Sequence, residues 1–151
     1  MTNGIPIGDL VTRSHALSVE KGWYETWPDG TTKAHNVNVP EKLALIHSEV
    51  SEALEAYRVD DIRRRCGVCN GERMKAIGAE LTTCDSCHGT GFLEIYPGEH
   101  GKPEGLAVEL ADVVIRVADL CGALGLDLAE AIERKHAYNT TRAYRHGGKK
   151  C

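Results

Sequence analysis

Two pairs of cysteines have the clearest chemistry in this sequence. Each pair has Cys-x-x-Cys spacing, and the pairs, Cys66/Cys69 and Cys84/Cys87, are separated by fourteen residues. Four thiolates at this spacing match the tetrahedral ligand set of structural zinc, and the glycines after each pair let backbone amides bend around the sulfurs. Because four thiolates leave no open coordination position, the sequence predicts a structural Zn²⁺ rather than a catalytic one.

Two pairs of carboxylates form a second candidate site. Glu49/Glu52 and Glu109/Asp112 are each spaced i, i+3, so on a helix each pair lies on one face. If the two helices pack antiparallel, the four carboxylates can converge and would repel one another. A hard divalent cation relieves that repulsion, and carboxylate oxygens suit Mg²⁺ or Mn²⁺. The pattern therefore predicts a magnesium or manganese site.

A solvated charged face is the alternative for both acidic pairs. It is an ordinary explanation for Glu49 and Glu52, because two glutamates on one helix face are common. It suits Glu109 and Asp112 less well, because the surrounding segment 103–124 is apolar almost all round and offers little solvated face.

Four helices have to position these groups. Apolar residues recur at helical spacing after Pro40, a residue that suits a first helical turn. Asp127 and Glu130 have the spacing of a capping box. The predicted helices span about residues 9–21, 40–61, 103–124 and 127–139.

The segment between the second and third helices is different in composition. Residues 63–102 are rich in glycine, hold all four paired cysteines and show no sustained helical period. We therefore predict an all-α fold in which residues 1–62 and 103–151 form one helical domain. Residues 63–102 are predicted to be an inserted zinc-ribbon module.

The bulk composition excludes some classes of protein. The 151 residues carry a formal net charge of −4, which argues against a nucleic-acid binder that works by a bulk positive field. No apolar run has the length of a membrane span, and the first residues lack the pattern of a signal peptide. We expect a cytoplasmic protein without a membrane or nucleic-acid partner.

Two segments resemble a known family. EKLALIHSEVSEALEAYR and the later GLAVELADVVIRVADLCGALGLDL are similar to the MazG-like all-α nucleoside triphosphate pyrophosphohydrolases. The resemblance implies a four-helix bundle, a homodimer or homotetramer, and cleavage of a nucleoside triphosphate to the monophosphate and pyrophosphate. It also implies that Glu49, Glu52, Glu109 and Asp112 bind Mg²⁺. One departure is Ser48, where many relatives have a third glutamate.

The C-terminal region is also similar to this family. Lys135, Asn139 and Arg142 match its Lys-x-x-x-Asn-x-x-Arg pattern, which lies near the substrate phosphates. Cations that complete a helix C-terminus are the alternative explanation. Gly147 and Gly148 could let backbone amides approach a phosphate.

An aromatic cluster in the first loop is a candidate for contact with the base. Trp23, with Tyr24 and Trp27, could stack on a nucleobase, although packing of the loop on the core is the commoner role for such residues.

The enzyme hypothesis gives each group a role. Glu49 or Glu52 would accept a proton from the attacking water, and Lys135 and Arg142 would stabilise the leaving pyrophosphate. The alternative hypothesis is that the helical domain is a catalytically inactive scaffold that carries a zinc-ribbon binding module. The module would bind protein or nucleic acid through the three successive arginines at residues 63–65. It predicts that Glu109 and Asp112 are dispensable.

Overall fold

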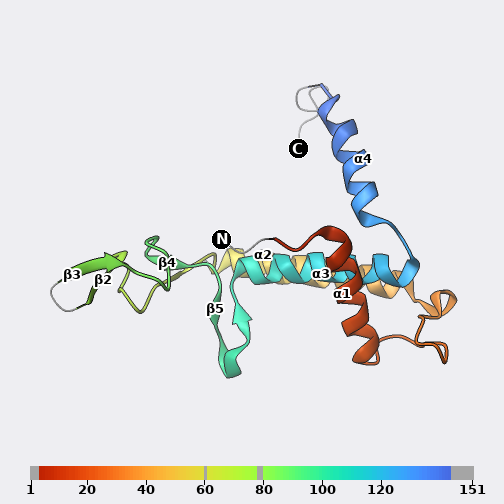
Figure 1. Cartoon of the computed structure of the whole chain (residues 1–151), viewed down its shortest axis with the longest axis horizontal. Helices are drawn as coiled ribbons and strands as arrows, with labels where there is room; N and C mark the ends of the chain where they lie inside the picture. Colours follow the sequence, from red (N-terminus) through yellow and green to blue (C-terminus); the bar gives the residue numbers. More distant parts are fainter. Residues whose placement is uncertain (1–3, 60, 78–79, 144–151) are drawn as a thin grey trace. The chain divides into compact units, whose positions relative to one another are not determined.

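The computed structural model describes residues 4–59, 61–77 and 80–143. In these residues the chain forms four α helices, which are α1 (Ile7–Glu20), α2 (Val39–Arg58), α3 (Leu106–Leu124) and α4 (Leu128–Thr140) (Figure 1). Six short strands lie between α2 and α3, namely β1 (Arg64–Arg65), β2 (Met74–Ile77), β3 (Glu80–Thr83), β4 (Phe92–Leu93), β5 (Tyr96–Pro97) and β6 (Pro103–Glu104). Two short 3₁₀ helices are η1 (Ala34–Asn36) and η2 (Glu99–Gly101).

The prediction of an all-α four-helix bundle is wrong. The strands pair antiparallel as β1–β4, β2–β3 and β5–β6, so the fold is mixed α and β. The segment around the cysteine turns is not helical, so its backbone N–H and C=O groups need other hydrogen-bond partners. The short β ladders provide such partners. The β-branched residues Ile77, Thr82 and Thr83 favour strands, but the glycines, the paired cysteines and the missing helical period of this segment led to the prediction of an insert without strands.

The chain divides into two compact units, Met1–Lys42 with Ile115–Cys151, and Leu43–Val114. In the first unit α1 packs against α4, and the second half of α3 is buried. Gly122 permits a close approach of α3 to α1, because a Cβ there would lie 2.5 Å from the Cβ of His15. The predicted cap of α4 is confirmed, since Asp127 accepts a hydrogen bond from the Glu130 amide at 2.9 Å.

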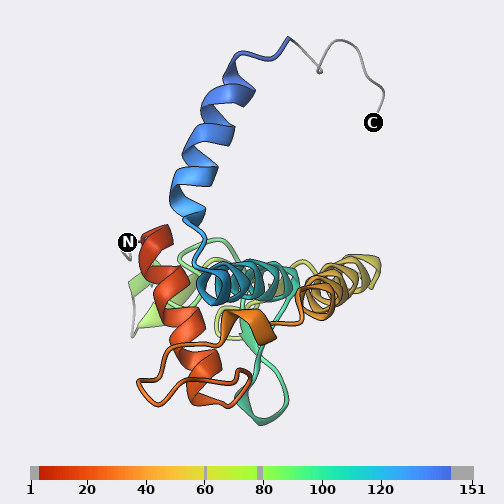
Figure 2. The ribbon, with the colours of Figure 1, turned by 90° about the vertical axis from the view of Figure 1, so that its right-hand side faces the viewer.

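The second unit holds most of α2, the first half of α3 and all six strands. The carbonyl of Asp61, just after α2, accepts a hydrogen bond from the amide of Leu106 at the start of α3, at 3.0 Å. Here the end of one helix meets the start of the next, so within this unit α2 and α3 run antiparallel and side by side (Figures 1 and 2). This pairing brings the two acidic helix faces together.

Across the three described stretches, no helix is both long enough and apolar enough to cross a membrane.

Candidate metal centres

The four paired cysteines converge into one buried cluster. Their sulfur atoms all lie within 4.8 Å of one another, with Sγ–Sγ distances of 3.9 Å for Cys66–Cys84 and 3.6 Å for Cys69–Cys87. A tetrahedral zinc with Zn–S bonds of about 2.3 Å needs sulfurs about 3.8 Å apart, whereas a disulfide needs about 2.05 Å. The predicted convergence is confirmed, and the spacing is that of metal ligands.

The two cysteine knuckles share one backbone design. In each, the amide five residues after the first cysteine donates back to that cysteine's carbonyl: Gly71 to Cys66 at 3.2 Å, and Gly89 to Cys84 at 3.3 Å. The knuckles also touch at Gly91, where φ is +83° and a Cβ would lie 2.7 Å from the Gly71 carbonyl oxygen. Only glycine adopts this positive φ readily and has no Cβ to clash with the Gly71 carbonyl. Gly71 and Gly91 therefore set how closely the two cysteine pairs approach each other.

The surroundings of the cluster favour a thiolate at Cys87. Burial opposes ionisation of Cys87, but the Gly91 amide, which donates to its sulfur at 3.3 Å, and the neighbouring thiols outweigh burial and lower its pKa to about 6. Burial and the hydrogen bond with Cys87 raise the pKa of Cys69 to about 11. Thiolate is the form in which cysteine binds a metal.

A second cluster joins three carboxylates from α2 and α3. Glu49, Glu109 and Asp112 each offer one oxygen, and these oxygens lie within 4.8 Å of one another. Octahedral Mg²⁺ holds oxygens at 2.0–2.1 Å, so its ligands are about 2.9 Å apart when adjacent and about 4.2 Å apart when opposite. The three carboxylates are therefore a candidate site for one cation.

The structure does not bring the fourth predicted carboxylate into this cluster. Glu52 is exposed and lies outside the group of three, whereas Glu49 is only 6% exposed. Glu52 is still near enough to raise the pKa of Glu109.

Glu109 carries the unusual electrostatics of the cluster. Its Oε2 atom is buried and has no hydrogen-bond partner among the described residues. Burial raises the pKa of Glu109, the carboxylates around it raise the pKa further, and Lys102 opposes them. An ionised carboxylate in this position costs free energy unless a cation or a proton compensates it.

The predicted phosphate-binding residues lie on or beyond α4. Lys135 and Asn139 are exposed on this helix, and the Lys135 ammonium lies 5.1 Å from the centroid of the Tyr138 ring. Because α4 ends at Thr140, Arg142 lies beyond the helix rather than on its face. Gly147 and Gly148 lie outside the described residues.

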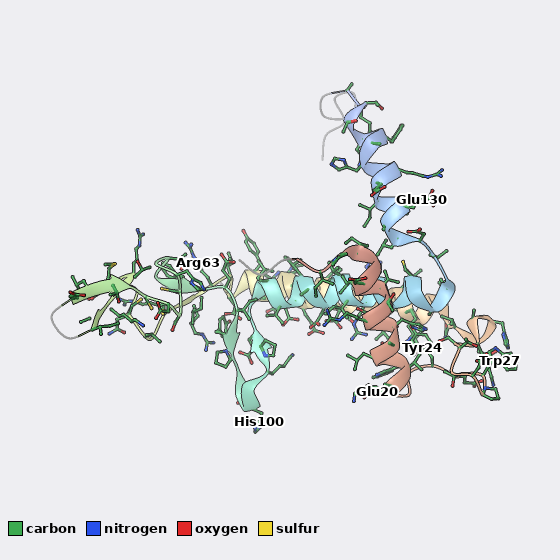
Figure 3. The ribbon with its side chains drawn as sticks, in the orientation of Figure 1. Glu20, Tyr24, Trp27, Arg63, His100 and Glu130 are labelled. Carbon is green, nitrogen blue, oxygen red and sulfur yellow. The ribbon has the colours of Figure 1, made fainter. Side chains whose placement is uncertain are left out.

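The predicted aromatic cluster lies in the loop after α1, where Figure 3 labels Tyr24 and Trp27. Trp23 is 68% exposed, and the Lys42 ammonium lies 5.8 Å from its ring. These residues and those of α4 belong to the unit Met1–Lys42 with Ile115–Cys151, whereas the three carboxylates belong to Leu43–Val114. Their joint action stays a prediction.

One network, around Asp119, was not predicted from the sequence. His15 bonds one Asp119 oxygen through Nδ1 at 3.1 Å, and the Tyr24 hydroxyl donates to the other at 2.7 Å. His15 Nε2 also meets the Thr32 hydroxyl at 2.7 Å. Burial and the bond to Asp119 raise the pKa of Tyr24. The partners are up to 104 residues apart, so no local spacing points to the network.

A cavity of about 810 Å³ lies beside this network. Its walls include Val11, Val19 and Leu124 along with His15 and Thr32. Both oxygens of Asp119 already have donors, so this acid is satisfied by the protein itself and contrasts with Glu109 on the same helix.

Comparisons with known proteins return nothing for this chain: no protein-family model, no curated protein and no solved structure matches it. The function therefore has to be argued from the two clusters.

Proposed function

We propose that this protein is a nucleoside triphosphate pyrophosphohydrolase that depends on Mg²⁺ or Mn²⁺ and carries a structural Zn²⁺. The observation that carries the proposal is the convergence of Glu49, Glu109 and Asp112 around a buried carboxylate oxygen for which no described residue is a donor. An ionised carboxylate there is costly in a folded protein unless a cation or a proton compensates it, and a cation would compensate all three acids at once.

Two acids on α3 show why a solvated face is the weaker explanation. Asp119 is buried, and hydrogen bonds from His15 and Tyr24 satisfy both of its oxygens. Glu109 has a buried oxygen that no described residue satisfies, and two further carboxylates lie beside it. The chain thus supplies donors for an acid with a structural role and leaves Glu109 open to an external cation.

The proposed mechanism assigns the remaining groups. A bound Mg²⁺ would hold phosphate oxygens and make a water molecule more acidic. Glu49, Glu109 and Asp112 would hold the cation, and the exposed Glu52 beside them would accept the proton of the attacking water.

Substrate contacts follow from the resemblance to the MazG-like family. Lys135 and Arg142 would neutralise charge on the leaving pyrophosphate, and Asn139 would donate hydrogen bonds to the phosphates. Trp23, which is exposed, would stack on the base.

The proposed ion in the cysteine cluster is zinc. Sulfur spacings of 3.6 and 3.9 Å bracket the edge of a zinc–thiolate tetrahedron. A reducing compartment such as the cytoplasm would keep these thiols available for the metal.

The proposed assembly is a homodimer or homotetramer. Large apolar side chains on α2 and α3 are about half exposed in the single chain, and exposed apolar side chains that gather on neighbouring helices are typical of a protein–protein interface. They are Leu43, Val50, Leu54, Leu110 and Val114.

A second candidate function is a docking module for protein or nucleic acid. The guanidinium of Arg63 lies 4.6 Å from the centroid of the partly exposed Phe92 ring, and Ile95 beside it is 60% exposed. Cationic and aromatic groups of this kind can contact a base or a peptide. This candidate requires no turnover and no role for Glu109.

The deciding experiment is a product assay on a panel of ribo- and deoxyribonucleoside triphosphates, with and without Mg²⁺ or Mn²⁺. We expect pyrophosphate release from at least one substrate, only with the cation present. Glu109→Gln should abolish release, whereas Glu55→Gln, an exposed acid on α2, should not change it. Orthophosphate as the primary product, or equal rates for the two variants, would refute the proposal.

A further inference from the structure

Tyr96 stands out as a buried tyrosine in the segment between α2 and α3. It is 3% exposed in β5, and it pairs with Glu104 of β6. The arm formed by these two strands extends to His100, which Figure 3 labels. The Tyr96 hydroxyl donates a hydrogen bond to a carboxylate oxygen of Asp61, and the Arg64 guanidinium lies 4.0 Å from the centroid of its ring. Packing alone would require only the aromatic ring, so the hydrogen bond of the hydroxyl to Asp61 needs a separate explanation.

The partner of Tyr96 links the two helices that carry the acids. Asp61 follows the end of α2, and its amide donates to the Ala56 carbonyl at 2.7 Å. Its carbonyl accepts the Leu106 amide, the first residue of α3, at 3.0 Å. Asp61 therefore contacts α2 and α3 through its backbone and Tyr96 through its side chain.

The same junction leads to Glu109. The Gly105 carbonyl accepts the Val108 amide at 2.8 Å and the Glu109 amide at 3.3 Å, so Gly105 begins the turn that presents Glu109. Gly105 has φ +114°, and a Cβ there would lie 2.6 Å from the Glu94 carbonyl oxygen and 3.3 Å from the Tyr96 ring. The start of α3 is thus packed closely against Tyr96.

We propose that Tyr96 is a positioning residue for the divalent cation. Its hydroxyl on Asp61 holds the start of α3 against the end of α2, and this contact sets the spacing of Glu49, Glu109 and Asp112. The inference rests on the proposed function, because it assumes that these carboxylates hold a cation.

A purely structural role for Tyr96 makes a different prediction. If the hydrogen bond to Asp61 only stabilises the fold, removing the hydroxyl lowers the thermal stability and leaves the cation affinity of the folded protein unchanged. If the hydroxyl positions α3, the affinity falls while the fold and the zinc site persist. Cation affinity therefore separates the two roles.

The test measures binding of Mn²⁺ alone to the full-length, zinc-loaded protein, by titration calorimetry or by the electron paramagnetic resonance signal of free Mn²⁺. Tyr96→Phe should weaken binding about fivefold or more, a usual size for energetic coupling between sites. In turnover, half-maximal rate should need more Mg²⁺, with kcat at saturating Mg²⁺ retained. Tyr57→Phe is the matched control, because Tyr57 is 60% exposed on α2.

A double-variant cycle with Asp61→Ala tests the contact itself. If both residues act through one hydrogen bond, the double variant should bind Mn²⁺ as weakly as either single variant, whereas independent effects would multiply. Equal affinities for Tyr96→Phe and wild type, or loss of zinc from Tyr96→Phe, would overturn the positioning role alone. Absence of Mn²⁺ binding in the wild type would overturn the proposed function, and this inference with it.

Discussion

The cysteine cluster and the carboxylate cluster belong to one compact unit but are built in opposite ways. The cysteines come from two local turns that share one backbone pattern, and all four are at most 6% exposed. The carboxylates come from two helices whose backbone hydrogen bonds do not involve these side chains. Of the three carboxylates, only Glu49 is buried. The first cluster is itself a small core, and the second lies on the surface of helices that have their own hydrogen bonds.

This difference indicates what each cation would contribute. Around the thiols, Leu93 is the only partly buried apolar residue, among those described, that packs against the four cysteines, so this cluster has little apolar packing apart from the cysteines. Around the carboxylates, the α-helical hydrogen bonds persist whether or not a cation binds. Loss of the first metal should therefore cost structure, and loss of the second should cost function.

The largest expected effect is loss of the cysteine module on zinc removal. Freshly reduced protein should contain about one zinc per chain, and Cys84→Ser or a strong chelator should unfold the strands, because structural zinc contributes about 10–16 kcal/mol in small metal-folded domains. The helical circular dichroism signal should largely remain. Elemental analysis and limited proteolysis between α2 and α3 measure the effect.

The control for this prediction is Cys121→Ser. Cys121 is buried in α3 and lies outside the cluster, so its replacement should leave the zinc content unchanged. A wild-type protein purified without zinc under reducing conditions would contradict the interpretation of the thiols as zinc ligands.

The next effect concerns Asp112, a member of the carboxylate cluster. Asp112→Asn should lower turnover by about 100-fold or more, since even outer-shell partners of a metal typically contribute 10- to 100-fold. The fold should persist, and stability without cation should rise slightly because like-charge repulsion is relieved. Mg²⁺ should raise the melting temperature of the wild type by mass action and leave that of the variant nearly unchanged.

A smaller effect separates Glu49 from Glu52. The structure brings Glu49 into the cluster and leaves Glu52 exposed beside it. Glu49→Gln should therefore weaken Mn²⁺ binding strongly, whereas Glu52→Gln should keep most of the affinity and lower kcat, in line with a role as proton acceptor. Calorimetry with Mn²⁺ and steady-state kinetics measure the two effects. An equal loss of affinity in both variants would show that the four acids act as one ligand set.

Local patterns made the cysteine cluster predictable. The Cys-x-x-Cys spacing fixes each knuckle within a few residues, and the capping pair Asp127 and Glu130 fixes the start of α4 in the same way. The strands were missed because each ladder has only two to four residues a side, too few for a strand period to appear in the sequence.

Long-range contacts explain what the sequence could not provide. The i, i+3 spacing placed Glu49 and Glu52 on one side of α2, but only the packing of α3 decides which one enters the cluster. Asp119 is an acid on the same helix as Glu109, yet His15 and Tyr24 satisfy both of its oxygens and make it a structural group. Both outcomes depend on residues far away along the chain.

The smallest expected effect comes from leaving an oxygen of Asp119 without a hydrogen-bond donor, as Glu109 Oε2 is among the described residues. Tyr24→Phe removes the donor to one Asp119 oxygen and leaves that acceptor largely buried. An unsatisfied buried polar group costs about 1–3 kcal/mol, so the free energy of unfolding should fall by that amount in urea denaturation. Tyr138→Phe is the matched control, because Tyr138 is 59% exposed on α4. Equal stability of the two variants would mean that water satisfies Asp119, and the missing donor of Glu109 would then carry less weight as a sign of a cation site.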